Sequence, residues 1–215
     1  MIDAVVFDVG ETLLDDSREW GAWADWLGVP RHTFSAVLGA VTAEGRDNTE
    51  TFEYFRPGFN VANERAEREK AGLGEQISED DLYADVRPSL TALREQGIWV
   101  GIAGNQTQRA AELLRALDLP VDRLATSGEW GVAKPAAGFF ERVITMAGVE
   151  PDRLLYVGDH RDNDVLPAKA AGLRAALIRR GPWGYLWADD PAVVAAADWV
   201  VDSLAELPSL LANAR

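Results

Sequence analysis

Three aspartates and one lysine stand at positions that a parallel sheet would bring to a common edge. Asp8 ends the apolar run AVVFD, Asp159 follows the run LLYVG, and Asp164 lies five residues further on. Lys134 precedes a proline in the loop GVAKP. Because ligands of open α/β sheets bind beyond the carboxyl ends of the strands, we expect these side chains to meet in one crevice. Carboxylates there suit a hard cation such as Mg²⁺, and an oriented carboxylate can act as a nucleophile.

The elements that must position these residues follow from the hydrophobic pattern. Short β-branched runs alternate with longer amphipathic stretches, which predicts an α/β fold: a Rossmann-like parallel sheet with helices on both faces. The expected strands are residues 4–8, 99–103, 154–157, 175–178 and 199–201. The expected helices around them are residues 89–96, 107–117, 138–147, 164–171 and a closing helix from about residue 203 to 211.

The interval of residues 14–86 breaks this alternation. It is rich in helix formers and in Trp, Phe and Arg, yet it contains no convincing buried strand. We therefore expect a core of residues 1–13 and 87–215, with residues 14–86 inserted as a helical domain after the first strand. Pro88 favours an extended predecessor and can occupy the first turn of a helix, so the chain is expected to re-enter the core there.

The motifs that contain these residues resemble those of the haloacid dehalogenase superfamily of hydrolases. Four motifs occur in the right order and cover nearly the whole sequence: VVFDVGETLLD, GIAGNQ, VAKP and YVGDHRDNDVLPAKAAGL. Any one of them would be weak, but four around a βα pattern indicate one family. The resemblance implies a haloacid dehalogenase-like core, and it makes the insertion a cap that closes over the crevice and selects the substrate.

The resemblance also implies a role for each site residue. Asp8 would be the nucleophile of a phosphatase, forming an aspartyl phosphate that water then hydrolyses. Mg²⁺ would be held by Asp8, the main-chain carbonyl of Gly10 and Asp159. Asp164 would be a further ligand or would lie just behind the ligands. Lys134 would neutralise the nucleophile and the incoming phosphate, stabilising charge in the transition state.

Two positions depart from the family's pattern. Family phosphatases carry a second Asp two residues after the nucleophile, and here that position is Gly10, which supplies no proton. Loss of a general acid/base typically costs about 10²–10⁴-fold in rate. The second motif usually offers Ser or Thr to the phosphate, whereas this chain has Gly104 followed by Asn105. Either these two residues bind phosphate through an N–H or amide group, or Gly104 permits a turn and Asn105 caps a helix.

Three functions stay open after these substitutions. The first is a phosphatase that is slow, or that is assisted by its substrate or by another residue such as Glu11 or His160. The second is a dehalogenase-like or phosphonatase-like hydrolase, since relatives with those chemistries also lack the second Asp. Against dehalogenation, a metal-free site that attacks a carboxylate substrate would gain nothing from the acidic pair Asp159 and Asp164. The third is a pseudoenzyme that binds a phosphorylated ligand or a protein partner without turnover.

Composition limits the class of partner. The chain has 35 acidic and 21 basic residues, a net charge of −14, which would repel a nucleic-acid backbone. With no cysteine, a metal would be held by oxygen or by the two histidines. The start MIDAVVFDVGETLLDD has acids inside its apolar run and no basic leader, so we expect no signal peptide, no membrane association and a cytoplasmic location. The expected partner is a small phosphorylated molecule, and the chain is expected to be a monomer or homodimer.

The remaining features support weaker expectations. Trp20, Trp23 and Trp26 recur at helical spacing and are expected to pack against the next helix. The segment RRGPWGY at residues 179–185 could border the crevice or a subunit contact, or it could be an ordered surface loop. Asn163 or Asp164 is expected to cap the helix that begins at residue 164. Three arginines of the insertion are candidates for holding a substrate anion, and none is assigned: Arg18, Arg46 and Arg56.

Overall fold

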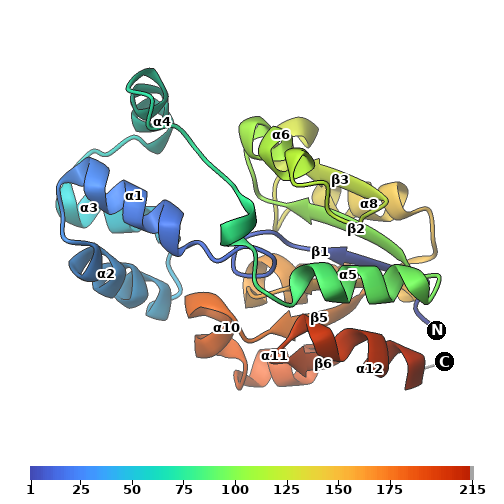
Figure 1. The fold of residues 1–215 in the computed structure, drawn as a ribbon. Helices are drawn as coiled ribbons and strands as arrows, with labels where there is room; N and C mark the ends of the chain where they lie inside the picture. The colour runs from blue at the N-terminus through green and yellow to red at the C-terminus, as the bar shows by residue number, and fades with distance from the viewer. Residues whose placement is uncertain (214–215) are drawn as a thin grey trace. The chain divides into compact units, whose positions relative to one another are not determined.

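A computed structural model of the chain describes residues 1–213. Within them lies a six-stranded parallel sheet of order β3-β2-β1-β4-β5-β6, with helices on both faces (Figure 1). The expected α/β class is therefore confirmed. The strands are β1 (Ala4–Phe7), β2 (Trp99–Gly104), β3 (Arg123–Thr126), β4 (Leu154–Gly158), β5 (Arg174–Ile178) and β6 (Trp199–Val201).

The central strands are apolar along their whole length because both faces of a parallel sheet are covered. Every residue of β1 and of β4 is buried. Phe7 of β1 pairs with Ile102 of β2 and Val157 of β4, so the residues that follow these strands leave the sheet at one edge. The edge strand β3 was not expected, because it has four residues and begins with an exposed Arg123 and a half-buried Leu124.

The helices around the sheet differ from the expected pattern at several places, and those at Ser127–Trp130 and Pro191–Ala196 were not expected. Helix α5 (Val86–Glu95) begins three residues earlier than expected, and Asp164 lies in a π-helical turn (Arg161–Val165) that precedes the short α9 (Leu166–Ala170). A surface loop was one expectation for residues 179–185, but α10 occupies Gly181–Trp187, so that expectation is wrong. The other helices of the core are α6 (Gln108–Ala116), α7 (Ser127–Trp130), α8 (Ala137–Ala147), α11 (Pro191–Ala196) and α12 (Leu207–Asn213).

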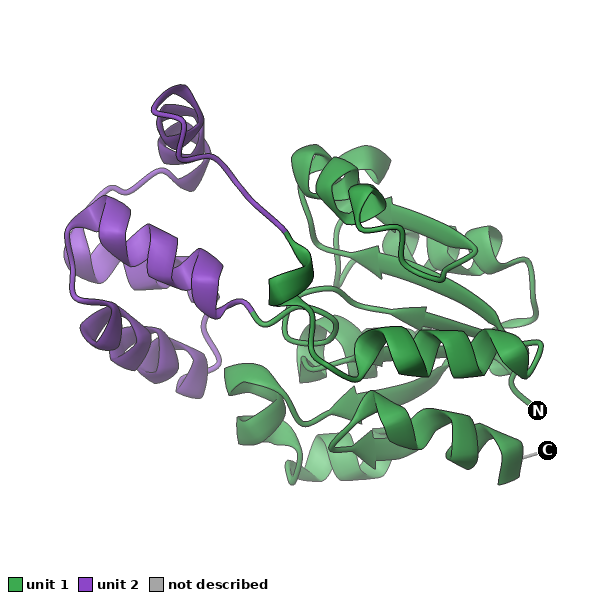
Figure 2. Cartoon of the chain, in the orientation of Figure 1, with its two compact units in different colours: residues 1–15, 78–215 green, residues 16–77 purple. Residues whose placement is uncertain are grey.

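The chain divides into two compact units (Figure 2). Unit 1 contains Met1–Asp15 and the chain from Ser78 onward, with the whole sheet, and unit 2 is Asp16–Ile77. Unit 2 is narrower than the interval 14–86, because main-chain bonds tie both connecting segments to unit 1. The N–H of Asp15 donates to Asp81 O (2.8 Å), and the N–H of Tyr83 donates to Leu13 O (3.0 Å).

Unit 2 is built from helices around an aromatic core. Phe52 is buried at its centre, with ring centroids 4.5 Å from Phe59 and 5.0 Å from Trp23. Trp23 is buried, and Trp20 and Trp26 pack partly buried against the same cluster, as their spacing predicts. Among the helices of residues 1–213, none has both the length and the apolar character needed to cross a membrane. The helices of unit 2 are α1 (Ser17–Leu27), α2 (Arg31–Ala43), α3 (Thr51–Phe55) and α4 (Val61–Lys70).

Candidate active site

Three carboxylates meet at the carboxyl edge of β1 and β4. Asp8 follows β1, Asp159 follows β4, and Asp164 lies in the π-helical turn after it. All three are buried, and one oxygen of each lies within 4.8 Å of the others. The structure thus brings together the three acids that the sequence placed at one edge.

Lys134 joins this cluster from the loop before α8. Its Nζ lies 2.6 Å from Asp8 Oδ1 and 2.6 Å from Asp164 Oδ1, and it sits 5.5 Å from the ring centre of Tyr156. The Lys134 side chain is itself buried, so its ammonium contacts the two carboxylates in place of water. Lys134 is therefore not a solvent-exposed surface lysine.

Burial sets the proton affinities of the cluster. It opposes the charge of Lys134, but Asp164 and Asp8 outweigh this effect and raise the pKa of the ammonium well above its usual value. Burial raises the pKa of Asp8 to about 6, which Lys134 opposes and Asp164 reinforces. Burial, with Asp164 and Asp8, raises the pKa of Asp159 well above its usual value. One ammonium thus does not balance the three carboxylates, and the ionised cluster favours an additional cation.

The unbalanced charge fits a divalent cation. Asp159 Oδ2 is buried and accepts no hydrogen bond from any residue among 1–213. A buried carboxylate oxygen without a partner is costly, and a hard cation would satisfy it. The donor set consists of oxygens alone, which suits Mg²⁺ better than a soft transition metal.

Two glycines make room for the carboxylates. A Cβ on Gly104, at the end of β2, would lie 2.5 Å from Asp8 Oδ1. A Cβ on Gly158, at the end of β4, would lie 2.2 Å from Asp164 Oδ2. The family resemblance predicts Ser or Thr at position 104, and the structure gives the glycine there a steric role that was not predicted. That Gly104 also binds phosphate through its main chain stays a prediction.

Asn105 holds the loop that carries Lys134. Its Nδ2 donates to Lys134 O (3.0 Å), and the N–H of Lys134 donates to Asn105 Oδ1 (2.8 Å). The expectation that Asn105 caps a helix is wrong, because Thr107 caps α6 by accepting from the N–H of Ala110 (2.9 Å). Both ends of the Asn105 amide already have a main-chain partner. Phosphate binding by Asn105 stays a prediction.

Gly10 and Glu11 form a tight turn after β1. The N–H of Glu11 donates to Leu14 O (2.8 Å), and Glu11 has a left-handed φ of 51°. Such a φ is unfavourable for a residue with a long side chain. Glu11 Oε2 accepts a hydrogen bond from the hydroxyl of Tyr83 (2.6 Å), and its charge is one of the causes that raise the pKa of Asp159. The Glu11 side chain therefore lies against Tyr83 and Gly181, and its charge acts on Asp159.

His160 caps the turn after β4. Its Nδ1 accepts from the main-chain N–H groups of Asp162 and Asn163, each at 3.1 Å. The expectation that Asn163 or Asp164 caps this helix is therefore wrong. Burial and the charge of Lys134 lower the pKa of His160 to about 4, so the imidazole is neutral at pH 7 and a poor proton donor.

The segment of residues 179–185, one possible border of the crevice in the sequence, contacts the turn after β1 through Arg180. Arg180, directly before α10, is buried and donates to Thr12 O (2.7 Å). It also pairs with Asp85 and stacks 4.2 Å from the ring centre of Tyr83. These contacts join segments more than seventy residues apart. They fix the turn after β1 from the segment that follows β5.

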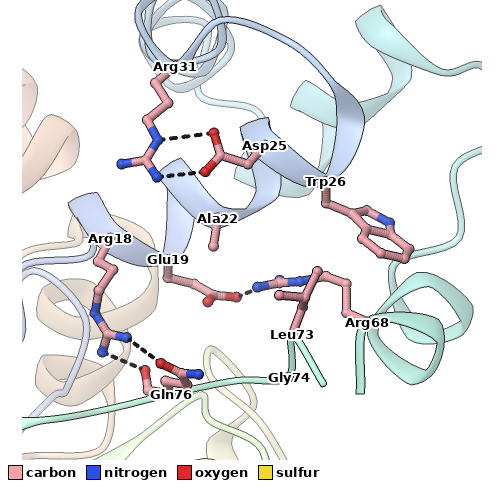
Figure 3. Close-up of a pocket in the computed structure, with 10 residues that line it drawn as sticks. All are labelled: Arg18, Glu19, Ala22, Asp25, Trp26, Arg31, Arg68, Leu73, Gly74 and Gln76. Atoms are coloured by element: carbon pink, nitrogen blue, oxygen red, sulfur yellow. Dashed lines mark hydrogen bonds and ion pairs between the residues drawn. The ribbon is translucent and has the colours of Figure 1, made fainter. Parts of the chain in front are cut away.

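Unit 2 contains a pocket of about 350 Å³ between α1 and residues 73–76 (Figure 3). Arg18 Nη2 donates to Gln76 O (2.9 Å), Arg31 pairs with Asp25, and the buried Arg68 pairs with Glu19. The other two candidate arginines are held by acids of the same unit. They are Arg46 on Glu50 (2.8 Å) and Arg56 on Glu64 (3.0 Å).

The sequence matches a known family over most of its length. Residues 2–172 match the family described as haloacid dehalogenase-like hydrolase. A glyceraldehyde 3-phosphate phosphatase from Methanopyrus kandleri is 35% identical over 104 residues, which make up 47% of this chain and 45% of that protein. The chain spans about half the length of the curated relatives it matches.

Solved structures share the fold along the whole chain. A phosphatase from Thermococcus onnurineus is 25% identical, with a TM-score of 0.59 over 98% of both chains. A 2-haloacid dehalogenase from Pseudomonas syringae pv. Tomato is 23% identical, with a TM-score of 0.59 over 100% of both chains. Because one fold is shared by phosphatases and dehalogenases, the choice of reaction has to come from the site residues.

Proposed function

The chain belongs to the haloacid dehalogenase-like hydrolase family, and on that basis we propose that it is a Mg²⁺-dependent phosphatase of a small phosphorylated metabolite. The observation that carries the proposal is the contact of Lys134 Nζ with Asp8 Oδ1 (2.6 Å) inside a buried group of three carboxylates. Relatives named as phosphatases, such as the glyceraldehyde 3-phosphate phosphatase, support the same reaction class.

The residues that would hold Mg²⁺ are the carboxylates of Asp8 and Asp159 and the main-chain carbonyl of Gly10. Asp164 is either a further ligand or the group that orients Lys134 behind them. The unpartnered Asp159 Oδ2 supports this assignment. When bound, Mg²⁺ would polarise the phosphate oxygens and offset the negative charge of the cluster.

Asp8 would act as the nucleophile. Its carboxylate attacks phosphorus, the bond from phosphorus to the leaving oxygen breaks, and an aspartyl phosphate forms. Water then attacks phosphorus, and the bond to Asp8 breaks to release phosphate. Lys134 favours the ionised form of Asp8 and would stabilise the charge on the equatorial oxygens.

Glu11 is the better supported substitute for the acid missing at Gly10. His160 is neutral at pH 7, and its Nδ1 is engaged by two main-chain N–H groups. The Glu11 carboxylate is instead held by the hydroxyl of Tyr83, and its charge acts on Asp159. We assign to Glu11 the proton transfers of the two half-reactions.

The insertion would serve as the cap that covers the site and selects the substrate. Its compact part is Asp16–Ile77, within the expected interval 14–86. A helical insertion directly after the first strand supports this role, because closing a cap excludes water from a reactive site.

The alternatives differ in what they require of the acidic cluster. A dehalogenase- or phosphonatase-like activity is favoured by Gly10, but three clustered carboxylates would repel the carboxylate of a haloacid. A pseudoenzyme would keep ligand binding without turnover.

A metal-dependent assay separates these functions. The protein would be incubated with a panel of phosphorylated metabolites with Mg²⁺ or with EDTA, and phosphate release measured. We expect Mg²⁺-dependent release that is lost in Asp8→Asn. Halide release from haloacids without added metal would replace the proposal by a dehalogenase, and ligand binding without any phosphate release would replace it by a pseudoenzyme.

A further inference from the structure

The turn that follows β4 begins with an unusual cap. The first N–H groups of any helical turn have no partner within the helix, and Ser, Thr, Asp or Asn usually accepts from them. Here the cap of Arg161–Val165 is His160, whose Nδ1 accepts from the N–H groups of Asp162 and Asn163 at 3.1 Å each. A ring nitrogen that accepts carries no proton, so the neutral imidazole carries its proton on Nε2.

Aromatic contacts fix the orientation of this ring. Its centroid lies 4.5 Å from that of Trp183 and 4.7 Å from that of Trp187, on α10. The Arg161 guanidinium lies 4.3 Å from the ring centre of Trp187 and pairs with Asp190 (3.0 Å). The side chain of His160 is therefore held by elements outside the turn that it caps.

The capped turn carries Asp164 to the reacting cluster. The main-chain N–H of His160 donates to Asp164 Oδ2 (2.9 Å), and the N–H of Asp164 donates to His160 O (2.9 Å). Asp164 Oδ1 in turn lies 2.6 Å from Lys134 Nζ, which contacts Asp8. A continuous series of contacts thus leads from the ring of His160 to the proposed nucleophile.

We infer that His160 is a positioning residue whose Nδ1 fixes the turn bearing Asp164 and thereby sets the places of Lys134 and the metal-binding carboxylates. This inference rests on the proposed function, because the positioned groups are the proposed Mg²⁺ and phosphate site. Residues that orient metal ligands typically contribute about 10–100-fold to metal affinity or activity. The role differs from that of a proton donor, because it needs an acceptor nitrogen and a fixed ring.

Two substitutions separate the acceptor from the aromatic ring. His160→Phe keeps a ring between Trp183 and Trp187 but removes the acceptor, whereas His160→Asn keeps an acceptor at a position where Asn is a favoured cap. His32→Phe is the matched control, since His32 is the other histidine of the chain and lies exposed at the start of α2. The measurements are calorimetric titration with Mg²⁺ alone, turnover of para-nitrophenyl phosphate, and thermal unfolding.

The expected results distinguish positioning from packing. For a folded His160→Phe we expect a Mg²⁺ Kd about tenfold weaker and a kcat about 10–100-fold lower, and His160→Asn should recover most of both losses. His32→Phe should match the unmodified protein. Wild-type Mg²⁺ affinity and kcat in His160→Phe would overturn the inference, as would an equal loss in a folded His160→Asn.

Two further observations keep the inference separate from the proposed function. Nitrogen-15 NMR of the imidazole should show the proton on Nε2, and a proton on Nδ1 would overturn the inference whatever the activity. If the unmodified protein neither binds Mg²⁺ nor hydrolyses the ester, the proposed function fails. A crystal structure of His160→Phe then decides: loss of the contact between Asp164 and Lys134 supports positioning, and its retention within about 3 Å overturns it.

Discussion

The side-chain amide of Asn105 exchanges two hydrogen bonds with the main chain of Lys134, across 29 positions of sequence. Asn105 follows β2, whereas Lys134 lies in the loop before α8, so this pair ties the lysine loop to the sheet. With its main chain fixed, Lys134 reaches Asp8 through the choice of side-chain rotamer alone. The amide therefore determines where the positive charge of the site stands.

Asn105→Ala should weaken catalysis more than stability. Without the amide, the Lys134 main chain loses both partners, and displacement of a catalytic group by about 1 Å can cost about 10²-fold in rate. We expect kcat for para-nitrophenyl phosphate to fall about 10–100-fold. Arg109→Ala, on the exposed face of α6, is the control and should leave kcat unchanged. Equal rates for Asn105→Ala and the unmodified protein would show that the lysine is positioned by other contacts.

The sequence predicted that four residues of the site would converge: Asp8, Lys134, Asp159 and Asp164. Asp8 and Asp159 directly follow strands of the parallel sheet, and Lys134 and Asp164 lie in the family's motifs. The carboxyl ends of parallel strands share one edge, so order along the chain gave proximity in space. Five of the six strands within residues 1–213 were predicted for the same reason: they are continuous apolar runs.

The rest depended on distances that no local pattern encodes. The steric role of Gly104 comes from the place of a carboxylate on another strand. Tyr83 and Arg180 reach the turn after β1 from segments about 70 and 168 residues away. His160 was considered as a proton donor because of its residue type, and its capping role emerged only from its contacts with the following N–H groups.

Asp8→Asn should abolish turnover and stabilise the metal-free protein at pH 7.5. The pKa of Asp8 is raised to about 6, above its usual value, so the folded state resists ionisation of this group. Its contribution to stability is therefore lost as pH rises through about 6. Removing the charge should raise the free energy of unfolding by about 1–3 kcal/mol at pH 7.5.

Urea denaturation in EDTA checks this prediction at pH 7.5 and at pH 4. The advantage of Asp8→Asn should disappear at the lower pH, where the folded protein holds Asp8 protonated. His160 acts in the opposite direction, because its lowered pKa makes stability rise with pH between about 4 and 6.5. The effect of His160 cancels when Asp8→Asn and the unmodified protein are compared at the same pH. If Asp8→Asn were the less stable protein at pH 7.5, the raised pKa of Asp8 would be contradicted.

Mg²⁺ should stabilise the protein more at pH 7.5 than at pH 5. The pKa values of Asp8 and Asp159 are raised, so protons compete with the cation as pH falls through about 6. We expect a rise in Tm on adding Mg²⁺ that shrinks steadily below pH 6 and vanishes in Asp159→Asn. Asp189→Asn is the control, because Asp189 is almost fully exposed. A Mg²⁺ effect independent of pH would indicate binding elsewhere.

Gly104→Ala should displace Asp8, the proposed nucleophile. The added Cβ would lie 2.5 Å from Asp8 Oδ1 and 3.0 Å from Val9 Cγ2, closer than van der Waals contact allows. We expect a kcat about 10–100-fold lower, since the carboxylate must move out of line with the phosphate. Gly138→Ala, in α8, is the control because its Cβ meets an ordinary contact at 3.6 Å, and it should keep full activity. Full activity in Gly104→Ala would mean that Asp8 can react from another rotamer.

Glu11→Gln should trap the aspartyl phosphate. Para-nitrophenolate is a good leaving group that needs no protonation, so with this ester a lost proton transfer slows only the attack of water on the intermediate. We expect turnover to fall about 10²–10⁴-fold while a phosphoprotein accumulates after acid quenching, and none forms in Asp8→Asn. Tyr83→Phe removes the hydroxyl that orients Glu11 and should cause a smaller loss. Turnover of Glu11→Gln at the unmodified rate, without phosphoprotein, would show that another group activates the water.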